Sequence, residues 1–137
     1  PYGISKQYRF NNIGKGVAYY SDSILKEEVG LQNEDSYTTI EVELQSKFNM
    51  LDVRSYDIPI FYLCHDKVDE KNRNYNKQYL LPNYISDCAK YNDFDGIIFK
   101  SVLNDKITNY AFFNLSMRDI KVIEKNNYNW KQYKEKT

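Results

Sequence analysis

The sequence carries no net charge and no long apolar run, and each absence removes a class of partner. Lys plus Arg and Asp plus Glu both number 19, so no overall field favours nucleic acid or an anionic membrane surface. No apolar stretch approaches the ~20 residues that span a bilayer, and the first residues lack the charged-then-apolar pattern of a signal peptide. We therefore expect a cytoplasmic protein that contacts neither nucleic acid nor membrane directly.

Cysteine and histidine are also scarce. The two cysteines, Cys64 and Cys88, form no CxxC pair, so we expect both to be reduced and buried, and we expect no metal site. The single histidine, His65, follows Cys64 directly, and neighbouring side chains rarely point together, so we interpret both residues as structural. No Gly-x-Ser-x-Gly motif surrounds Ser101, which makes acyl-transfer chemistry a poor fit.

What the chain does have is enough apolar and aromatic content for a core. With 137 residues, 42% of them hydrophobic, and 14 Tyr and 7 Phe, it is large enough to fold without disulfides. The sequence starts at Pro1 rather than at a methionine. We therefore interpret residues 1–137 as a single domain that is truncated at its N-terminus.

Apolar periodicity predicts an α+β fold. A helix of about two turns is expected between Ser21 and Gly30, and a longer helix begins near Leu81, with Pro82 in its first turn. Helical spacing places Leu80, Leu81, Tyr84, Ile85, Cys88 and Ala89 on the apolar side of the second helix. The predicted strands cover residues 17–20, 37–44, 50–53, 96–99, 109–113 and 120–123.

The strand over residues 37–44 has the strictest alternation, which predicts a half-buried strand with Ile40 and Leu44 on its apolar face. Residues 66–77 are charged and lack periodicity, so they are expected to form a surface loop. Together these elements predict a single compact domain in which a mixed, curled sheet and a few helices enclose the core. A doubly wound parallel sheet is not expected.

Two blocks of residues resemble a known family over roughly the whole chain. The first block spaces an arginine, a glycine, a tyrosine and an acidic residue: Arg9-Phe10-Asn11, Gly14, Tyr19 and Glu28-Val29. The second block is the more specific: Phe94-Asp95-Gly96-Ile97, Ser101, Asn109 and Ala111-Phe112-Phe113. The chain resembles the RES domain, a family of bacterial toxin-type proteins that is named for its arginine, glutamate and serine and acts on NAD.

The resemblance implies a fold similar to ADP-ribosyltransferase toxins, NAD as a substrate rather than a cofactor, and a cognate antitoxin protein as partner. It also implies that Arg9 and Tyr19 line the NAD pocket, with Ser101 and Asn109 on the opposite wall. Glu28 would be the catalytic acidic residue. Our candidate catalytic residues are therefore Arg9, Glu28 and Ser101, and our candidate substrate-binding residues are Arg9, Tyr19, Ser101 and Asn109.

These residue types suit that chemistry. The guanidinium of Arg9 matches a phosphate fork, and a carboxylate near the ribose stabilises the oxocarbenium-like centre that forms as nicotinamide leaves. Glu27 and Glu28 diverge by about 100° around a helix, so only one of them can face a pocket beside Tyr19. The ring of Tyr19 can stack on nicotinamide or ribose, and Ser101 can bind phosphate or ribose from the end of a buried strand.

Several alternatives remain open. Arg9 and the two glutamates can be ordinary surface residues, Tyr19 a core residue and Ser101 a strand-end turn residue, and Glu27 can replace Glu28. The acceptor can be water or phosphate, which makes the enzyme an NAD glycohydrolase or phosphorylase. It can also be a protein side chain, which makes it an ADP-ribosyltransferase. The alternative outside the enzymes is a non-catalytic RES-like module that binds a nucleotide or a partner.

Overall fold

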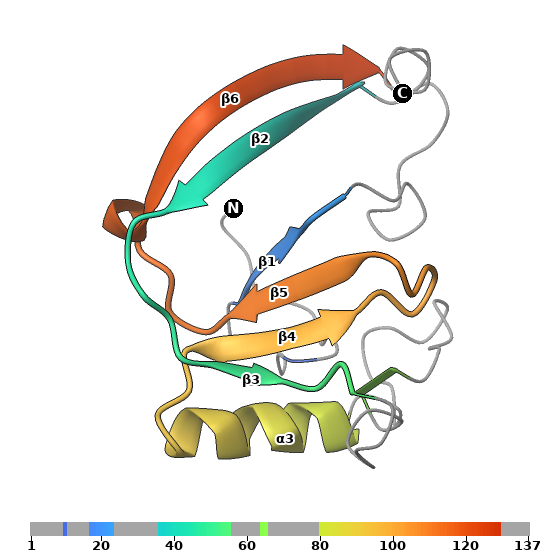
Figure 1. The fold of residues 1–137 in the computed structure, drawn as a ribbon, viewed down its shortest axis with the longest axis vertical. Helices are drawn as coiled ribbons and strands as arrows, with labels where there is room; N and C mark the ends of the chain where they lie inside the picture. Colours follow the sequence, from blue (N-terminus) through green and yellow to red (C-terminus); the bar gives the residue numbers. More distant parts are fainter. Residues whose placement is uncertain (1–9, 11–16, 24–35, 56–63, 66–79, 130–137) are drawn as a thin grey trace. The chain divides into compact units, whose positions relative to one another are not determined.

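The structure is a computed structural model that describes residues 10, 17–23, 36–55, 64–65 and 80–129. These residues hold one α-helix, one 3-10 helix and six strands, which form two separate sheets (Figure 1). The chain groups into two compact units, unit 1 with Pro1–Ser23 and Phe48–Leu115, and unit 2 with Ile24–Lys47 and Ser116–Thr137. The combination of helix and sheets confirms the predicted α+β class, while the single domain over residues 1–137 stays a prediction.

Unit 1 is built on an open, mixed four-stranded sheet. Its strand order is β1-β5-β4-β3, with β3 and β4 parallel and the other neighbours antiparallel. The strands are β1 (Ala18–Ser21), β3 (Met50–Asp52), β4 (Gly96–Lys100) and β5 (Thr108–Phe112). The predicted strands at 17–20, 50–53, 96–99 and 109–113 are thus confirmed to within one residue at each end.

The strand register assigns each side chain of this sheet to one of two faces. Tyr19, Ala111 and Ile97 are direct neighbours across β1, β5 and β4, so they share one face. Phe99 and Asn109 lie two residues along from Ile97 and Ala111 and join them. We call this side the core face and the other side, which bears Lys100 and Thr108, the opposite face.

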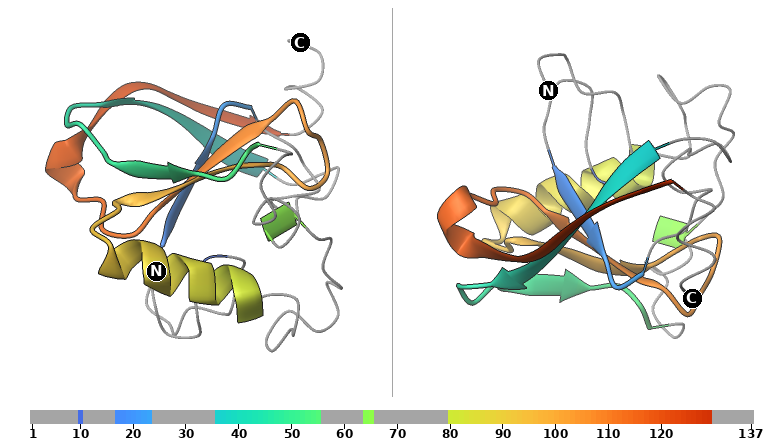
Figure 2. Two further views of the ribbon diagram at one scale, coloured as in Figure 1. Left: turned by 60° about the horizontal axis from the view of Figure 1, so that its bottom comes forward. Right: turned by 90° about the horizontal axis from the view of Figure 1, so that it is seen from above.

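The core face packs against helix α3 (Leu80–Tyr91), which lies along the sheet in Figure 1 and in the two views of Figure 2. The buried hydrophobic cluster on this side consists of Phe10, Val53, Cys64, Ile97, Phe99 and Ala111, with Ile85 of α3 packed against it. The rings of Phe10 and Phe99 meet edge to face, with 4.7 Å between their centroids. Phe10 is thereby packed onto the middle of the sheet.

Helix α3 begins one residue before the predicted start, and Pro82 lies in its first turn as expected. The predicted apolar side is wrong in part, because Leu80, Leu81 and Tyr84 are exposed. Ala89 is buried and Ile85 packs against the core, as predicted, but the other buried positions are Pro82, Asn83 and Ser86. The reason lies in a polar contact. The Ser86 hydroxyl donates a 2.7 Å hydrogen bond to the Phe10 carbonyl, so the side of the helix facing the core carries polar residues that hydropathy alone does not detect.

The C-terminus of α3 directs the chain into β4. The N–H groups of Asp93 and Phe94 donate to the carbonyls of Lys90 and Ala89, and Asp93 adopts a left-handed φ of 63°. This is the Schellman arrangement that ends many helices. Directly after it, Asp95 is fixed to Asn49: their backbones pair at 2.7 Å, and Asp95 Oδ2 accepts the Asn49 N–H at 2.7 Å. The starts of β3 and β4 are therefore aligned.

Unit 2 contains a two-stranded antiparallel sheet of β2 (Ser36–Leu44) and β6 (Ile120–Asn129), with a register shift at Glu41/Val42. Both strands were predicted, β6 with a shorter span. The predicted burial is wrong: Ile40 and Leu44 are 52% and 45% exposed. A strand in a two-stranded sheet has only one neighbour, and the register shift breaks the regular alternation, so the apolar face is only partly covered.

Asp119 connects the two strands at one end of this sheet, where β2 ends and β6 begins. It closes the 3-10 helix η3 (Met117–Asp119), where its Oδ2 accepts hydrogen bonds from the backbone N–H and hydroxyl of Ser116 at 2.9 and 3.0 Å. Its Oδ1 accepts the Ser46 hydroxyl at 2.9 Å, and its carbonyl accepts the Gln45 N–H. One carboxylate thus joins the segment after β2 to the segment before β6.

Two predicted elements, the helix expected between Ser21 and Gly30 and the loop over residues 66–77, fall mainly or wholly outside the described residues. Both cysteines are free, with Cys64 buried and Cys88 only half-buried, so the prediction that both are buried holds for Cys64 alone. Among the residues with a described structure, no helix is long and apolar enough to cross a bilayer.

Gly96 is the position in β4 where a larger side chain is least tolerated. A Cβ there would overlap the Ala111 carbonyl oxygen and lie 2.8 Å from Met50 Cε. We expect Gly96→Ala to lower the free energy of unfolding by about 3 kcal/mol, measured by urea denaturation. Adding Met50→Ala should restore little of this loss, because the main obstacle is backbone. Full recovery in the double variant would contradict this explanation.

Asp119 should make unit 2 sensitive to acid. Its pKa is lowered from the ordinary 3.8, first by the backbone N–H of Ser116 and then by the Ser46 hydroxyl. Since the folded pKa lies below the unfolded value, the stabilisation is complete above pH 3.8 and is lost as pH falls through the lowered pKa. A ¹³C NMR titration of the carboxyl should give a midpoint below 3.8 that Ser46→Ala moves upward. An unchanged midpoint would contradict the role of Ser46.

Candidate functional site

Three of the predicted site residues have a described position, and all three belong to unit 1. Tyr19 lies in β1, Asn109 lies in the adjacent β5, and Ser101 directly follows β4. Arg9, Glu27 and Glu28 lie outside the described residues. The strand pairing places Tyr19 and Asn109, 90 positions apart in the sequence, on adjacent strands and on the same face. Ser101 lies beyond the far end of β4, on the other side of β5 from Tyr19.

Tyr19 is the accessible member of this group, with 41% of its surface exposed. Its hydroxyl oxygen accepts the Phe10 N–H at 3.3 Å, and its ring meets Phe99 edge to face at 6.5 Å between centroids. Phe10 is the residue covalently attached to Arg9. Tyr19 therefore holds the second residue of the Arg9-Phe10 motif against the core face of the sheet.

Ser101 and Asn109 are buried, with 3% and 8% of their surfaces exposed. The Ser101 hydroxyl oxygen accepts the N–H groups of Leu103 and Asn104, both at 3.2 Å, and its own N–H donates to the Ile107 carbonyl at 2.9 Å. These bonds organise the turn that connects β4 to β5. In this arrangement neither Ser101 nor Asn109 presents an open surface to a ligand.

His65 has a structural contact that the sequence gives no means of finding. Its Nε2 accepts the backbone N–H of Lys100 at 2.8 Å, and its ring lies 6.4 Å from that of Phe99. Because β3 ends at Asp52, the imidazole serves as the acceptor that a longer strand would have supplied to the end of β4. This contact supports the interpretation of His65 as structural. It requires Nε2 to be unprotonated, which assigns the proton of the neutral ring to Nδ1.

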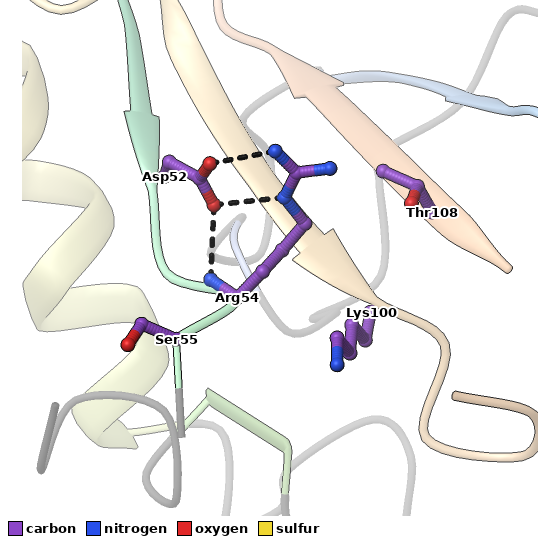
Figure 3. A pocket seen from close by; sticks show the side chains of 5 residues that line it. All are labelled: Asp52, Arg54, Ser55, Lys100 and Thr108. Atoms are coloured by element: carbon purple, nitrogen blue, oxygen red, sulfur yellow. Dashed lines mark hydrogen bonds and ion pairs between the residues drawn. The ribbon is translucent and has the colours of Figure 1, made fainter. Parts of the chain in front are cut away.

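A cavity of about 450 Å³ lies at the end of β3 and β4 and the start of β5. Side chains from these three segments line it (Figure 3): Asp52, Arg54, Ser55, Lys100 and Thr108. None of these residues belongs to the predicted site. The only signal in the sequence is the Asp-x-Arg spacing at the end of β3, which puts both side chains on the same side of an extended chain.

Asp52 and Arg54 form a bidentate ion pair in this cavity. Arg54 Nε and Nη2 donate to Asp52 Oδ1 and Oδ2 at 2.9 and 2.7 Å, and the Arg54 backbone N–H donates to Oδ1 at 3.0 Å. The hydrogen bond from Arg54 lowers the pKa of Asp52, and the same bond raises the pKa of Arg54. Since both side chains remain partly exposed, the pair orients the guanidinium more than it stabilises the fold.

The cavity lies on the face of the sheet opposite to that of Tyr19 and Asn109, the two predicted site residues that belong to described strands. Lys100 and Thr108 are paired residues. Lys100 follows Phe99 and Thr108 precedes Asn109, and the side chains of Phe99 and Asn109 are on the core face, so those of Lys100 and Thr108 are on the opposite face. Within the described chain, no cluster of three or more His, Cys, Asp or Glu residues is suited to holding a metal ion. The structure thus offers two separate candidate surfaces in unit 1.

Comparisons with known proteins do not add a family assignment. No protein-family model matches the chain, no curated protein is found to be similar to it, and no solved structure matches it. The resemblance to RES domains accordingly stays a prediction from the residues quoted above.

Ser101 generates a prediction about stability. Ser101→Ala removes the acceptor of two N–H groups in a buried turn, so we expect a loss of about 1–2 kcal/mol in the free energy of unfolding by urea. Ser23→Ala removes the same atoms at an exposed position and should change the stability by less than about 0.5 kcal/mol. Equal effects of the two substitutions would show that the Ser101 hydroxyl does not support the turn.

Proposed function

We propose that the protein is an NAD-consuming toxin domain of the RES type that breaks the bond between nicotinamide and ribose in the cytoplasm. The observation that carries this proposal is the hydrogen bond from the Phe10 N–H to the Tyr19 hydroxyl. It links the first two elements of the resemblance, the Arg9-Phe10 segment and Tyr19, on the face that also bears Asn109. Tyr19 and Asn109, which the resemblance places in one pocket, lie on adjacent strands, and this supports the proposal.

In this proposal the exposed residues meet the substrate. Arg9 binds the pyrophosphate of NAD through its guanidinium fork, and the exposed ring of Tyr19 packs against nicotinamide or its ribose. The C–N bond breaks with its electron pair going to nicotinamide, which leaves as a neutral molecule. The Glu28 carboxylate stabilises the oxocarbenium-like ribose until water or phosphate adds to it.

The buried residues act behind this surface. Asn109 pairs with Ser21 in β1, two residues from Tyr19, and the Ser101 hydroxyl holds the turn that leads into β5. We expect Ser101 and Asn109 to affect turnover by positioning β1 and β5 rather than by touching the reacting atoms. The cognate antitoxin implied by the resemblance would act by covering the exposed surface at Tyr19.

One observation favours the non-catalytic alternative. Because Ser101 and Asn109 are buried, a ligand on this face meets fewer polar groups than the resemblance implies, which suits a module that binds without turnover. An ADP-ribosyltransferase is the other alternative, in which a protein side chain takes the place of water or phosphate. The same experiment separates all three readings.

The experiment incubates the purified chain with NAD, with and without phosphate, and follows nicotinamide and ADP-ribose products by chromatography. We expect nicotinamide release that Arg9→Ala abolishes and that Glu28→Gln lowers by about 10²–10³-fold in kcat, with NAD binding nearly unchanged. Tyr19→Phe keeps the ring but loses the oxygen that accepts the Phe10 N–H, and should lower the rate of nicotinamide release about fivefold. Dependence on phosphate would identify a phosphorylase.

Glu27→Gln is the matched control and should be nearly silent. If Glu27→Gln abolishes release and Glu28→Gln does not, the assignment within the acidic pair is wrong. NAD binding without release would support the binding module. Release that appears only with transfer of labelled ADP-ribose to an added protein would support the transferase. The proposal would be overturned if the chain neither bound NAD nor released nicotinamide.

A further inference from the structure

Ser86 places a buried hydroxyl on the side of helix α3 that faces the core. Only 1% of its surface is exposed, and Phe10, whose carbonyl accepts the hydroxyl hydrogen at 2.7 Å, is completely buried. The hydroxyl of a serine within a helix often donates to the carbonyl four residues earlier in the same helix. In Ser86 the hydroxyl is instead directed to a residue 76 positions away in the chain. Helix α3 therefore makes a specific polar contact with Phe10.

Phe10 is held at three points by three different elements. Its carbonyl accepts from Ser86 of α3, and its N–H donates to the Tyr19 hydroxyl of β1. Its ring packs against Phe99 of β4. The N–H belongs to the peptide bond that joins Arg9 to Phe10. The contacts with Ser86 and Tyr19 thus lie on the two sides of one α-carbon, so a shift at one carries over to the other.

The hydrogen bond from Ser86 is the shorter and the more deeply buried of the two. It measures 2.7 Å between two buried residues, whereas the Phe10 N–H lies 3.3 Å from the oxygen of Tyr19, which is 41% exposed. A short hydrogen bond that is shielded from water is stronger than a long one near the surface. The Ser86 hydroxyl and the Phe99 ring therefore determine where Phe10 lies, and the Tyr19 hydroxyl meets the N–H at the place so defined.

We propose that Ser86 is a positioning residue of the proposed NAD site. It holds Phe10 from the helix side, and Phe10 in turn sets the position of the Tyr19 hydroxyl and thereby that of the exposed Tyr19 ring. This inference rests on the proposed function, in which Tyr19 and Arg9 bind NAD. Because Ser86 is buried, it acts through Phe10 and does not touch the substrate.

The expected signature is a change in KM rather than in kcat. In the proposed function Tyr19 and Arg9 contribute to NAD binding, whereas the Glu28 carboxylate acts on the charge that develops in the transition state. Ser86→Ala removes the donor to the Phe10 carbonyl, so we expect the KM for NAD to rise about tenfold while kcat changes less than about twofold. Ser86→Cys fills the same space with a weaker donor and should raise KM about threefold. It decides the question if Ser86→Ala does not fold.

Ala89→Gly is the matched control, because Ala89 is a buried residue one turn further along α3. Glycine within a helix and the loss of a buried hydrogen bond should each lower the melting temperature by about 3–6 °C. Ala89→Gly leaves the Ser86 hydroxyl in place, so we expect its KM to stay within about twofold of the wild-type value. A residue that only stabilises the helix would affect KM equally in both variants.

The kinetic outcome decides the inference if the wild-type chain acts on NAD. A KM for Ser86→Ala that stays near the wild-type value, or that rises no more than in Ala89→Gly, would overturn the inference. If NAD is bound without turnover, the Kd measured by calorimetry takes the place of KM, with the same expected ratios between the variants.

A second readout needs no NAD and separates a failure of this inference from a failure of the proposed function. In ¹H–¹⁵N NMR spectra of the full chain, we expect the amides of Phe10 and Tyr19 to shift in Ser86→Ala and to stay in place in Ala89→Gly. If the wild-type chain neither binds NAD nor releases nicotinamide, the proposed function fails and these amides alone show whether Ser86 positions Phe10 and Tyr19. Unchanged amides in Ser86→Ala would overturn the inference.

Discussion

Phe99 is the side chain on which the core of unit 1 depends. Its ring contacts those of Phe10, Tyr19 and His65, all of which are more than 30 residues away from it in the sequence. Polar bonds then fix the positions of these residues: the Phe10 N–H donates to Tyr19, the Phe10 carbonyl accepts from Ser86, and the Lys100 N–H donates to His65. Aromatic burial supplies the attraction, and these few hydrogen bonds determine how the segments are oriented.

Three consecutive residues at the end of β4 have three different structural roles. Phe99 packs into the core, Lys100 lines the cavity on the opposite face, and Ser101 organises the turn that follows. This separation follows from the two-residue period of a strand, which sends neighbouring side chains to opposite faces. The same strand can therefore support two chemically different surfaces, one aromatic and one rich in donors.

The sequence predicted those features that depend on local periodicity, and it failed where distant residues meet. The strands of unit 1 and the start of α3 follow from alternation and from the first-turn proline. The exposure of Tyr84 and the burial of Ser86 do not, because they depend on the carbonyl of Phe10, 76 residues away in the chain. The cavity at the end of β3 and β4 was likewise missed, since its lining residues Arg54 and Lys100 come to the same edge of the sheet only through the parallel pairing of these strands.

The pairing of β1 with β5 has a consequence for how the protein is made. Ala18 lies opposite Phe112, so nearly all of unit 1 separates the two partners along the chain. Contacts of such long range carry a large loop-closure entropy and form late in folding. A nascent chain on the ribosome therefore carries an unpaired β1 until β5 has emerged, and the surface around Tyr19 is assembled only after that point.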